Sequence, residues 1–285
     1  MTKTIALDRE PHWRSAGISK AIPGRRTRKV AQRRTLPRKE RLLISVIGIV
    51  GVLALWQLAS TTGRVDSTIT SSPSEIARTA VDMIRSGKLQ SALGSSAKLF
   101  VTGFGIALAL GLATGIVLGW YKRIEALVDP WVSILYASPR VALIPVFMVW
   151  TGIGFKTQVV IVVTIAAFPI IINTSAGVSS IDRNHLQLAR SFLATNRDVL
   201  FTIALPGSIP LILAGVRQGL MQGLIGVVVA EYFVGATGVG GLIFNAGQVL
   251  DTAQAFVGAA LFAVAAMILS SLVKLIERRL DRWRA

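Results

Sequence analysis

Long apolar runs without a single charged residue dominate the pattern of this chain. Four such runs cover residues 42–59, 99–121, 157–181 and 252–273. A run of about 18 or more apolar residues is long enough to cross the hydrocarbon core of a bilayer as a helix. None of the runs shows the strict alternation that is typical of the strands of a membrane barrel. The pattern therefore predicts an all-α polytopic membrane protein.

Two further apolar stretches each carry one arginine. Residues 130–155 contain Arg140 and three prolines, and residues 208–230 contain Arg217. Since proline interrupts helical hydrogen bonding, the first stretch is predicted to be a broken or kinked span. Together with the uncharged runs, these stretches predict six transmembrane helices, at about 42–59, 98–121, 131–150, 157–178, 208–231 and 253–274.

Residues 232–250 are long enough for a seventh span, but they contain five glycines, which disfavour a helix. We expect a loop or a shallow re-entrant segment there. The distribution of charge also supports six spans, because 13 of the 31 Lys and Arg residues lie within residues 1–41 and five within 274–284. Six spans place both basic ends on one side of the membrane, which the positive-inside rule makes the cytoplasmic side.

The chain is therefore predicted to have three parts. Residues 1–41 form a basic, disordered cytoplasmic tail. Residues 42–275 form the transmembrane domain, and residues 276–285 form a basic cytoplasmic C-terminus. The first apolar run fills a bilayer and has no clear cleavage site after it, so we expect an uncleaved span of a plasma-membrane protein and not a signal peptide.

An amphipathic helix is predicted in the outer segment 60–97. Ser72 is its expected N-cap, Pro73 its first residue, Glu75 the partner in a capping box and Gly87 its C-terminal stop. The apolar residues at helical spacing are Ile76, Ala80, Met83 and Ile84. Such a helix either lies on the bilayer or offers a docking surface to an outer partner.

Several kinds of chemistry are excluded by composition. The chain has no cysteine and only two histidines, so neither a thiolate site nor a histidine metal cluster is expected. It has no phosphate-binding loop with adjacent Gly-Lys, so we expect no nucleotide or other cofactor on this chain. The net charge of +17 gathers beside the apolar runs, which indicates topology and attraction to anionic lipid and does not indicate nucleic-acid binding.

Apart from lysines at the ends of two spans, the few ionisable residues within the predicted spans are Arg140, Arg217 and Glu231. Each arginine either attracts an anionic solute or has a structural role, such as an ion pair or snorkelling to the headgroups. Glu231 either serves an outer gate or caps the glycine-rich segment after it. Carriers driven by ion gradients usually contain buried acidic relays, and only Glu231 qualifies, so the energy for transport is expected to come from elsewhere. A self-sufficient carrier or channel remains the alternative.

A polar segment, "RNHLQLARSFLATNRDVLFTIALP", interrupts the apolar pattern at residues 183–206. Arg183, Arg190 and Arg197 are seven residues apart, so one continuous helix would align them on one face. Leu186, Ala189 and Leu193 follow a separate apolar line. We expect an amphipathic helix or helix pair at the cytoplasmic surface, ended by a corner at Pro206. It is either an interfacial helix or a handle for a cytoplasmic partner.

This segment resembles the EAA loop of permease subunits in binding-protein-dependent ABC importers. That loop reads Glu-Ala-Ala, three residues, Gly, nine residues, Ile, one residue and Leu-Pro. Here the matching positions are Gln187, Leu188, Ala189, Leu193, Ile203, Leu205 and Pro206, with Arg190 and Ala194 also fitting the motif. The departures are Gln187 for Glu, Leu188 for Ala and Leu193 for Gly. The missing Gly normally permits a turn between two short helices, so we expect a more continuous helix or an altered coupling geometry.

The resemblance extends over about residues 65–275. "GFGIALALGLATGIVLGWYKRIEALVDPWV", "FPIIINTSAGVSSID", "LPGSIPLILAGVRQGL" and "IGVVVAEYF" are similar, in this order, to permeases of the nitrate, sulfonate and taurine type. Arg140 departs from the apolar residue or proline expected there.

The resemblance implies the type I ABC importer permease (MetI-like) fold with six spans and no catalytic residues. It implies a second permease copy, identical or related, ATPase subunits that bind ATP, and a periplasmic solute-binding protein. The loop would couple this chain to the ATPase through Leu186, Gln187, Leu188, Ala189, Arg190, Leu193, Ala194, Ile203, Leu205 and Pro206. The solute is expected to be small and anionic, like a sulfonate, taurine or nitrate.

Overall fold

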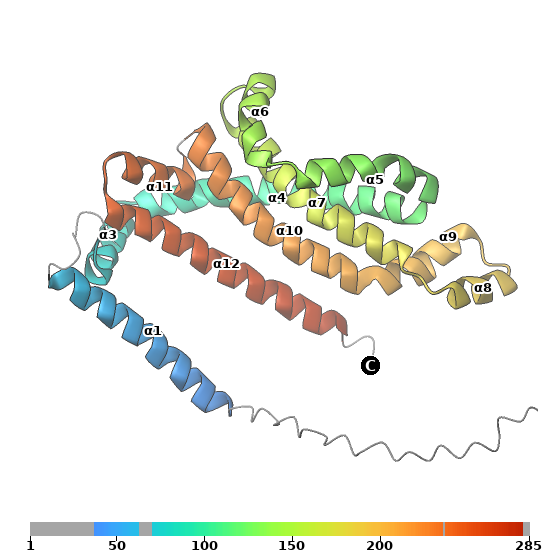
Figure 1. Ribbon diagram of the computed structural model, residues 1–285, viewed down its shortest axis with the longest axis horizontal. Coiled ribbons are helices and arrows are strands. Elements are labelled where there is room, and N and C mark those ends of the chain that lie inside the picture. The colour runs from blue at the N-terminus through green and yellow to red at the C-terminus, as the bar shows by residue number, and fades with distance from the viewer. Residues whose placement is uncertain (1–36, 63–69, 236, 282–285) are drawn as a thin grey trace, which may run out of the picture. The chain divides into compact units, whose positions relative to one another are not determined.

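The computed structural model describes residues 37–62, 70–235 and 237–281, all within or between helices, and no strand occurs among them (Figure 1). It divides into two compact units, one ending at Ile49 and the other comprising Val50–Ala285. Most of the predicted basic tail and the last four residues of the C-terminus lie outside the described residues. The helices are α1 (Arg38–Thr61), α3 (Pro73–Arg85), α4 (Lys88–Trp120), α5 (Lys122–Ala137), α6 (Ile144–Thr151), α7 (Phe155–Ser179), α8 (Arg183–Ser191), α9 (Asn196–Val199), α10 (Leu205–Val234), α11 (Gly238–Gln248) and α12 (Thr252–Asp281).

Five helical stretches of the described chain are long and apolar enough to cross a membrane: Leu43–Thr61, α4, α7, Asn196–Val234 and Thr252–Leu275. A sixth crossing is possible where α5 is followed by a 3₁₀ turn (Arg140–Leu143) and α6, bent by 92°. The bend follows Ser138 and Pro139, whereas Pro130 lies inside α5. The expected proline-broken span is therefore a bent helix pair.

Two predicted boundaries differ from the structure. Helix α4 begins at Lys88, ten residues before the predicted span 98–121, so it is about 50 Å long and exceeds the hydrocarbon core. Of the two alternatives for residues 232–250, the loop is wrong, since Gly238–Gln248 form α11, and the shallow re-entrant segment stays a prediction. Eleven residues rise only about 16 Å, so α11 is too short to be a seventh span.

Helix α7 lies between α4 and α10, and both contacts depend on rows of small residues. On α4, Gly103, Ala107, Gly111, Gly115 and Gly119 recur every four residues and are buried. A Cβ added to the glycines of this row would meet α7 atoms at 2.6–2.8 Å. On α10, Gly215 and Gly219 approach α7 as closely. Small residues at such spacing let helix backbones approach in a membrane, where apolar burial alone does not drive association.

The predicted outer helix is α3, and its N-cap, its first residue and its C-terminal glycine are confirmed. The predicted capping box is not formed, because the Glu75 carboxylate accepts from Ser71 Oγ at 2.9 Å. Ser72 Oγ accepts a hydrogen bond from Glu75 N–H, and Gly87 adopts a left-handed conformation after the helix ends. Its apolar face packs into the protein, because Met83 joins a buried cluster with Leu89, Ala92, Val239, Leu242 and Val257. Ile76 and Ala80 also pack against this cluster, whereas Ile84, the fourth residue of the predicted face, is 49% exposed. Packing inside the fold thus uses part of the apolar face that a helix lying on the bilayer would offer to lipid.

Candidate functional site

Two short helices follow α7 and occupy the polar segment, and Figure 1 shows them beyond the ends of α7 and α10. Helix α8 begins after Asp182, whose side chain accepts a hydrogen bond from Asn184 N–H. Helix α9 begins after Thr195, which forms a reciprocal capping box with Asp198. These two caps are coded locally, and they define two helix starts within the segment.

The turn between α8 and α9 is a Schellman motif with a leucine at its left-handed position. Leu193 has φ of 57°, its N–H donates to Arg190 O, and Ala194 N–H donates to Ala189 O. Glycine favours this conformation, and a side chain there costs about 1–2 kcal/mol. The expected continuous helix is therefore wrong, and Arg190 and Arg197 lie on different helices.

The residues of the predicted apolar face, Leu186, Ala189 and Leu193, differ in burial. Ala189 is buried and Leu186 is half-buried, so both lie against the rest of the chain. Around the turn after α8, the exposed apolar side chains are Leu188, Phe192 and Leu193, which are 58%, 78% and 91% accessible. These three residues are here called the apolar knob, and Gln187 beside them is also exposed. Further along the segment, Phe201 is 65% accessible.

A cavity of about 430 Å³ lies behind the apolar knob. Leu186, Arg190 and Ala194 line it from the loop, and Trp120 and Lys122 line it from the turn between α4 and α5. Arg190 and Lys122 therefore lie at the same cavity although 68 residues separate them. The loop is thus positioned by the α4–α5 turn as well as by its own caps.

The end of the segment departs from the expectation of a corner at Pro206. Leu200–Ala204 form a π-helical turn, in which Leu205 N–H donates to Leu200 O, and Leu205 is helical. The helix runs on from Asn196 to Val234. Pro206 lacks an N–H and the wider turn next to it accommodates this, since π-turns often replace regular bonding at such positions. Ile203 and Leu205 are half-buried in this continuous helix.

Arg140 lies at the start of the 3₁₀ turn between α5 and α6. Its Nη1 donates to Ile165 O at 3.1 Å and its Nη2 to Tyr136 O at 3.2 Å. Its guanidinium also lies 5.1 Å from the ring of Tyr136 and 5.6 Å from the ring of Phe168. These contacts favour the structural alternative, in which Arg140 holds the bend between α5 and α6 against α7.

The other predicted pathway arginine, Arg217, is exposed on α10. It lies between the glycines 215 and 219 that contact α7, so its side chain leaves α10 away from that contact. The two arginines are thus placed differently. Arg140 is held within the fold by its hydrogen bonds, whereas Arg217 is exposed on α10.

Glu231 is buried near the end of α10 and caps α11. Its carboxylate accepts hydrogen bonds from Ser96 Oγ at 2.7 and 2.9 Å and from Gly240 N–H at 2.8 Å. Ser96 Oγ in turn accepts from Val239 N–H at 2.9 Å. A Cβ on Gly238, which has φ of 70°, would lie 2.0 Å from Glu231 Oε1. The geometry therefore supports the capping role, because the Glu231 carboxyl accepts from a backbone N–H in the first turn of α11.

Sequence reasoning missed Ser96, which is 135 residues from Glu231. The glycines at 238 and 240 were the available signal, because they remove the side chains that would collide with Glu231.

Replacing Glu231 by alanine is expected to loosen α11. The change leaves the Gly240 N–H and the Ser96 hydroxyl without their acceptor in a buried place, at about 1–3 kcal/mol for each unsatisfied group. Hydrogen exchange should then rise over residues 238–248. Glu231→Gln keeps one acceptor and should retain most of the protection; equal loss in both variants would show that the charge, and not the cap, is required.

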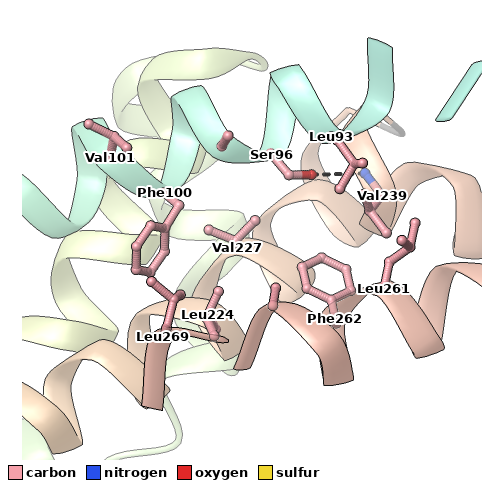
Figure 2. Close-up of a pocket in the computed structure, with 12 residues that line it drawn as sticks. Leu93, Ser96, Phe100, Val101, Leu224, Val227, Val239, Leu261, Phe262 and Leu269 are labelled. Carbon is pink, nitrogen blue, oxygen red and sulfur yellow. Dashed lines mark hydrogen bonds between the residues drawn. The ribbon is translucent and has the colours of Figure 1, made fainter. Parts of the chain in front are cut away.

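An apolar cavity of about 220 Å³ lies beside this cap, between α4, α10 and α12. Figure 2 shows Phe100, Val227 and Phe262 around it, with the hydrogen bond from Val239 N–H to Ser96. Ser96 is its only polar side chain, and its hydroxyl is already bonded to Glu231 and Val239. The cavity therefore offers nothing to a charged solute.

Comparison with protein families gives one match over most of the chain. Residues 92–284 match the family described as the inner membrane component of binding-protein-dependent transport systems. A Bacillus subtilis protein that bears the name aliphatic sulfonates transport permease protein SsuC is 34% identical over 233 residues, which are 82% of this chain and 84% of that protein. The taurine transport system permease protein TauC of Escherichia coli is 30% identical over 177 residues, 62% of this chain and 64% of TauC.

Solved structures show the same fold at low identity. A chain of the MetNI methionine ABC transporter, in an inward-facing conformation, superposes with a TM-score of 0.60 and 18% identity over 67% of this chain and 95% of that one. A chain from the crystal structure of an amino acid ABC transporter with histidines superposes with a TM-score of 0.58 and 17% identity over 70% of this chain and 97% of that one.

Proposed function

Because the chain belongs to the multi-pass inner-membrane permeases of binding-protein-dependent ABC transporters, of the sulfonate and taurine type, we propose that it forms the membrane pathway of an ATP-driven importer. In this proposal a periplasmic binding protein delivers a small anionic solute, a second permease copy completes the pathway, and ATPase subunits bind the cytoplasmic side. Both termini then lie in the cytoplasm, in agreement with their basic charge.

The observation that carries the proposal is the apolar knob of Leu188, Phe192 and Leu193. Exposed large apolar side chains grouped on a short, doubly capped helix are typical of a surface that a partner covers. We propose that this group inserts into a groove of the ATPase, with Arg190 and Gln187 at its rim.

The path of force follows from the helix connections. Residues 196–234 form one helix, so a displacement of α9 is transmitted along the whole of α10. Helix α8 joins it through the turn at Leu193, and α10 packs closely against α7. Closure of two ATPase subunits then moves α10 and α7 together, as a rigid body, between the two access states.

On the outer side, α3 supports docking of the binding protein. Its inner face is used in the fold, and Arg78, Asp82 and Arg85 line a shallow hollow on its outer face. Mixed charges there suit a polar, reversible contact, in which charge complementarity sets the rate of encounter.

Reconstitution in liposomes tests the proposed function. The solute is first identified as the compound that raises the melting temperature of the partner binding protein. We expect its uptake to require this chain, the ATPase, the binding protein and ATP together. Uptake by the purified chain alone, without ATP, would instead establish the self-sufficient carrier or channel.

A further inference from the structure

A second polar cavity lies at the other end of the fold from the apolar knob, where α7 begins and α10 ends. It has a volume of about 360 Å³. The residues that matter for its chemistry are Ser95, Lys98, Phe155, Gln158, Glu231 and Thr237. Three helices and the segment before α11 therefore contribute to one hollow.

Lys98 is the cation of this cavity. It is the one charged residue between positions 89 and 121, and it lies ten residues, or about 15 Å, along α4 from Lys88. Its Nζ lies 5.3 Å from the centre of the Phe155 ring. A cation within a candidate membrane helix is costly, so it calls for a functional explanation.

The carboxylate that shares the cavity forms no salt bridge with Lys98 in the described part of the chain. Glu231 accepts hydrogen bonds from Ser96 Oγ and Gly240 N–H instead. Glu231 balances the N-terminal end of α11, where it accepts from Gly240 N–H. The charge of Lys98 therefore remains available to a ligand.

Two further features of the cavity suit an anion. Thr237 Oγ1 accepts from Gln158 Nε2 at 3.2 Å, which leaves the threonine hydroxyl hydrogen available to donate. The first turn of α7 also faces the cavity at Gly154 and Phe155, and its N-cap, Gly154, has no side chain to cap it. The helix end adds positive potential to that of Lys98.

We propose that this cavity binds the sulfonate or similar oxyanion group of the solute at the outer mouth of the pathway, with Lys98 as the main partner. The assignment to the solute rests on the proposed function. An anionic lipid headgroup has the same chemistry, so the experiment separates the two sources.

The test uses the absence of cysteine from the chain. Ser95→Cys places one thiol at the cavity and keeps Lys98. The full chain, reconstituted in phosphatidylcholine vesicles, is treated with the anionic reagent sulfonatoethyl methanethiosulfonate and with its trimethylammonium analogue. Because a local cation concentrates the anionic reagent, we expect Lys98→Gln to lower the ratio of the two rates about tenfold, and Lys98→Arg to retain it.

Lys156→Gln is the matched control, because Lys156 is an exposed lysine on the first turn of α7 that does not line the cavity. An equal ratio with and without Lys98 would overturn the proposal. So would a Lys98 effect that appears only when phosphatidylglycerol is added. Methanesulfonate should slow labelling in the presence of Lys98, and absence of this protection would also count against the site.

Labelling does not require transport. Failure of ATP-driven uptake by the wild-type complex, with normal labelling ratios, would therefore reject the proposed function and leave the anion site in place. Normal uptake with an unchanged KM for the solute in Lys98→Gln would reject the site alone.

Discussion

Replacing Phe192 by aspartate is expected to abolish ATP-driven uptake while the permease still folds. Phe192 is 78% accessible and lies at the end of α8, so the substitution disturbs little inside this chain. In the proposed complex it places an unpaired charge in an apolar contact, and central aromatic residues at interfaces commonly cost about 2 kcal/mol or more when removed. Binding of the ATPase should weaken at least about thirtyfold, measured by co-purification and by uptake in proteoliposomes.

Ser191→Asp is the matched control. It adds the same charge to the neighbouring residue of α8, which is exposed and polar. Ser191→Asp should keep more than half of the uptake. If Phe192→Asp transports normally, or if both variants fail equally, the apolar knob does not couple the two subunits. Ala189→Asp is a poor probe, because Ala189 is buried and the variant would test folding.

Replacing Gly115 by valine is expected to give the largest loss of stability. A Cβ at Gly115 would lie 2.6 Å from Thr174 Cβ and 2.8 Å from Ile171 O, which belongs to the backbone of α7. Since the backbone carbonyl cannot rotate away, α4 and α7 must separate, and overpacking of this kind costs about 1–3 kcal/mol or more. The melting temperature of the purified protein in detergent should fall clearly.

Gly105→Val provides the comparison within the same helix. No heavy atom lies within 4 Å of a Cβ built there, so valine meets open space. Its helix propensity also exceeds that of glycine. The melting temperature of Gly105→Val should equal that of the wild type or exceed it. Equal destabilisation by the two substitutions would show that α4 needs glycine for a reason other than its contact with α7.

The secondary structure of the polar segment 183–206 was only partly predictable. Its caps at Asp182 and Thr195 are local signals, and the boundaries of the segment could be read from its charge. The left-handed Leu193 and the π-turn before Pro206 were not predicted, because propensity favours a helix at the first and a break at the second. At Leu193 and at Pro206, the backbone conformation that joins the neighbouring helices differs from the one that the single residue prefers.

The contacts between residues far apart in the chain could not be predicted from the sequence. Ser96 and Glu231 are 135 residues apart in the sequence. Lys98 lies at the edge of a predicted span, and the sequence did not indicate which residues share a cavity with it. The bounds of α3 could be predicted from its N-cap and its apolar periodicity. Periodicity does not show whether an apolar face packs against lipid or against protein. Only the packing of α3 with α11 and α12 decided that.

By itself, the sequence determined the membrane class, the family and nearly all of the spans, because hydropathy and the loop motif are properties of short continuous stretches. The tertiary structure decided which helices touch and which side chains remain exposed. These depend on close approach between segments far apart in the chain, as at the glycines of α4 and α10 that enclose α7. The division of the loop into a buried Ala189 and an exposed Phe192 is of the same kind, since burial is a property of the whole fold.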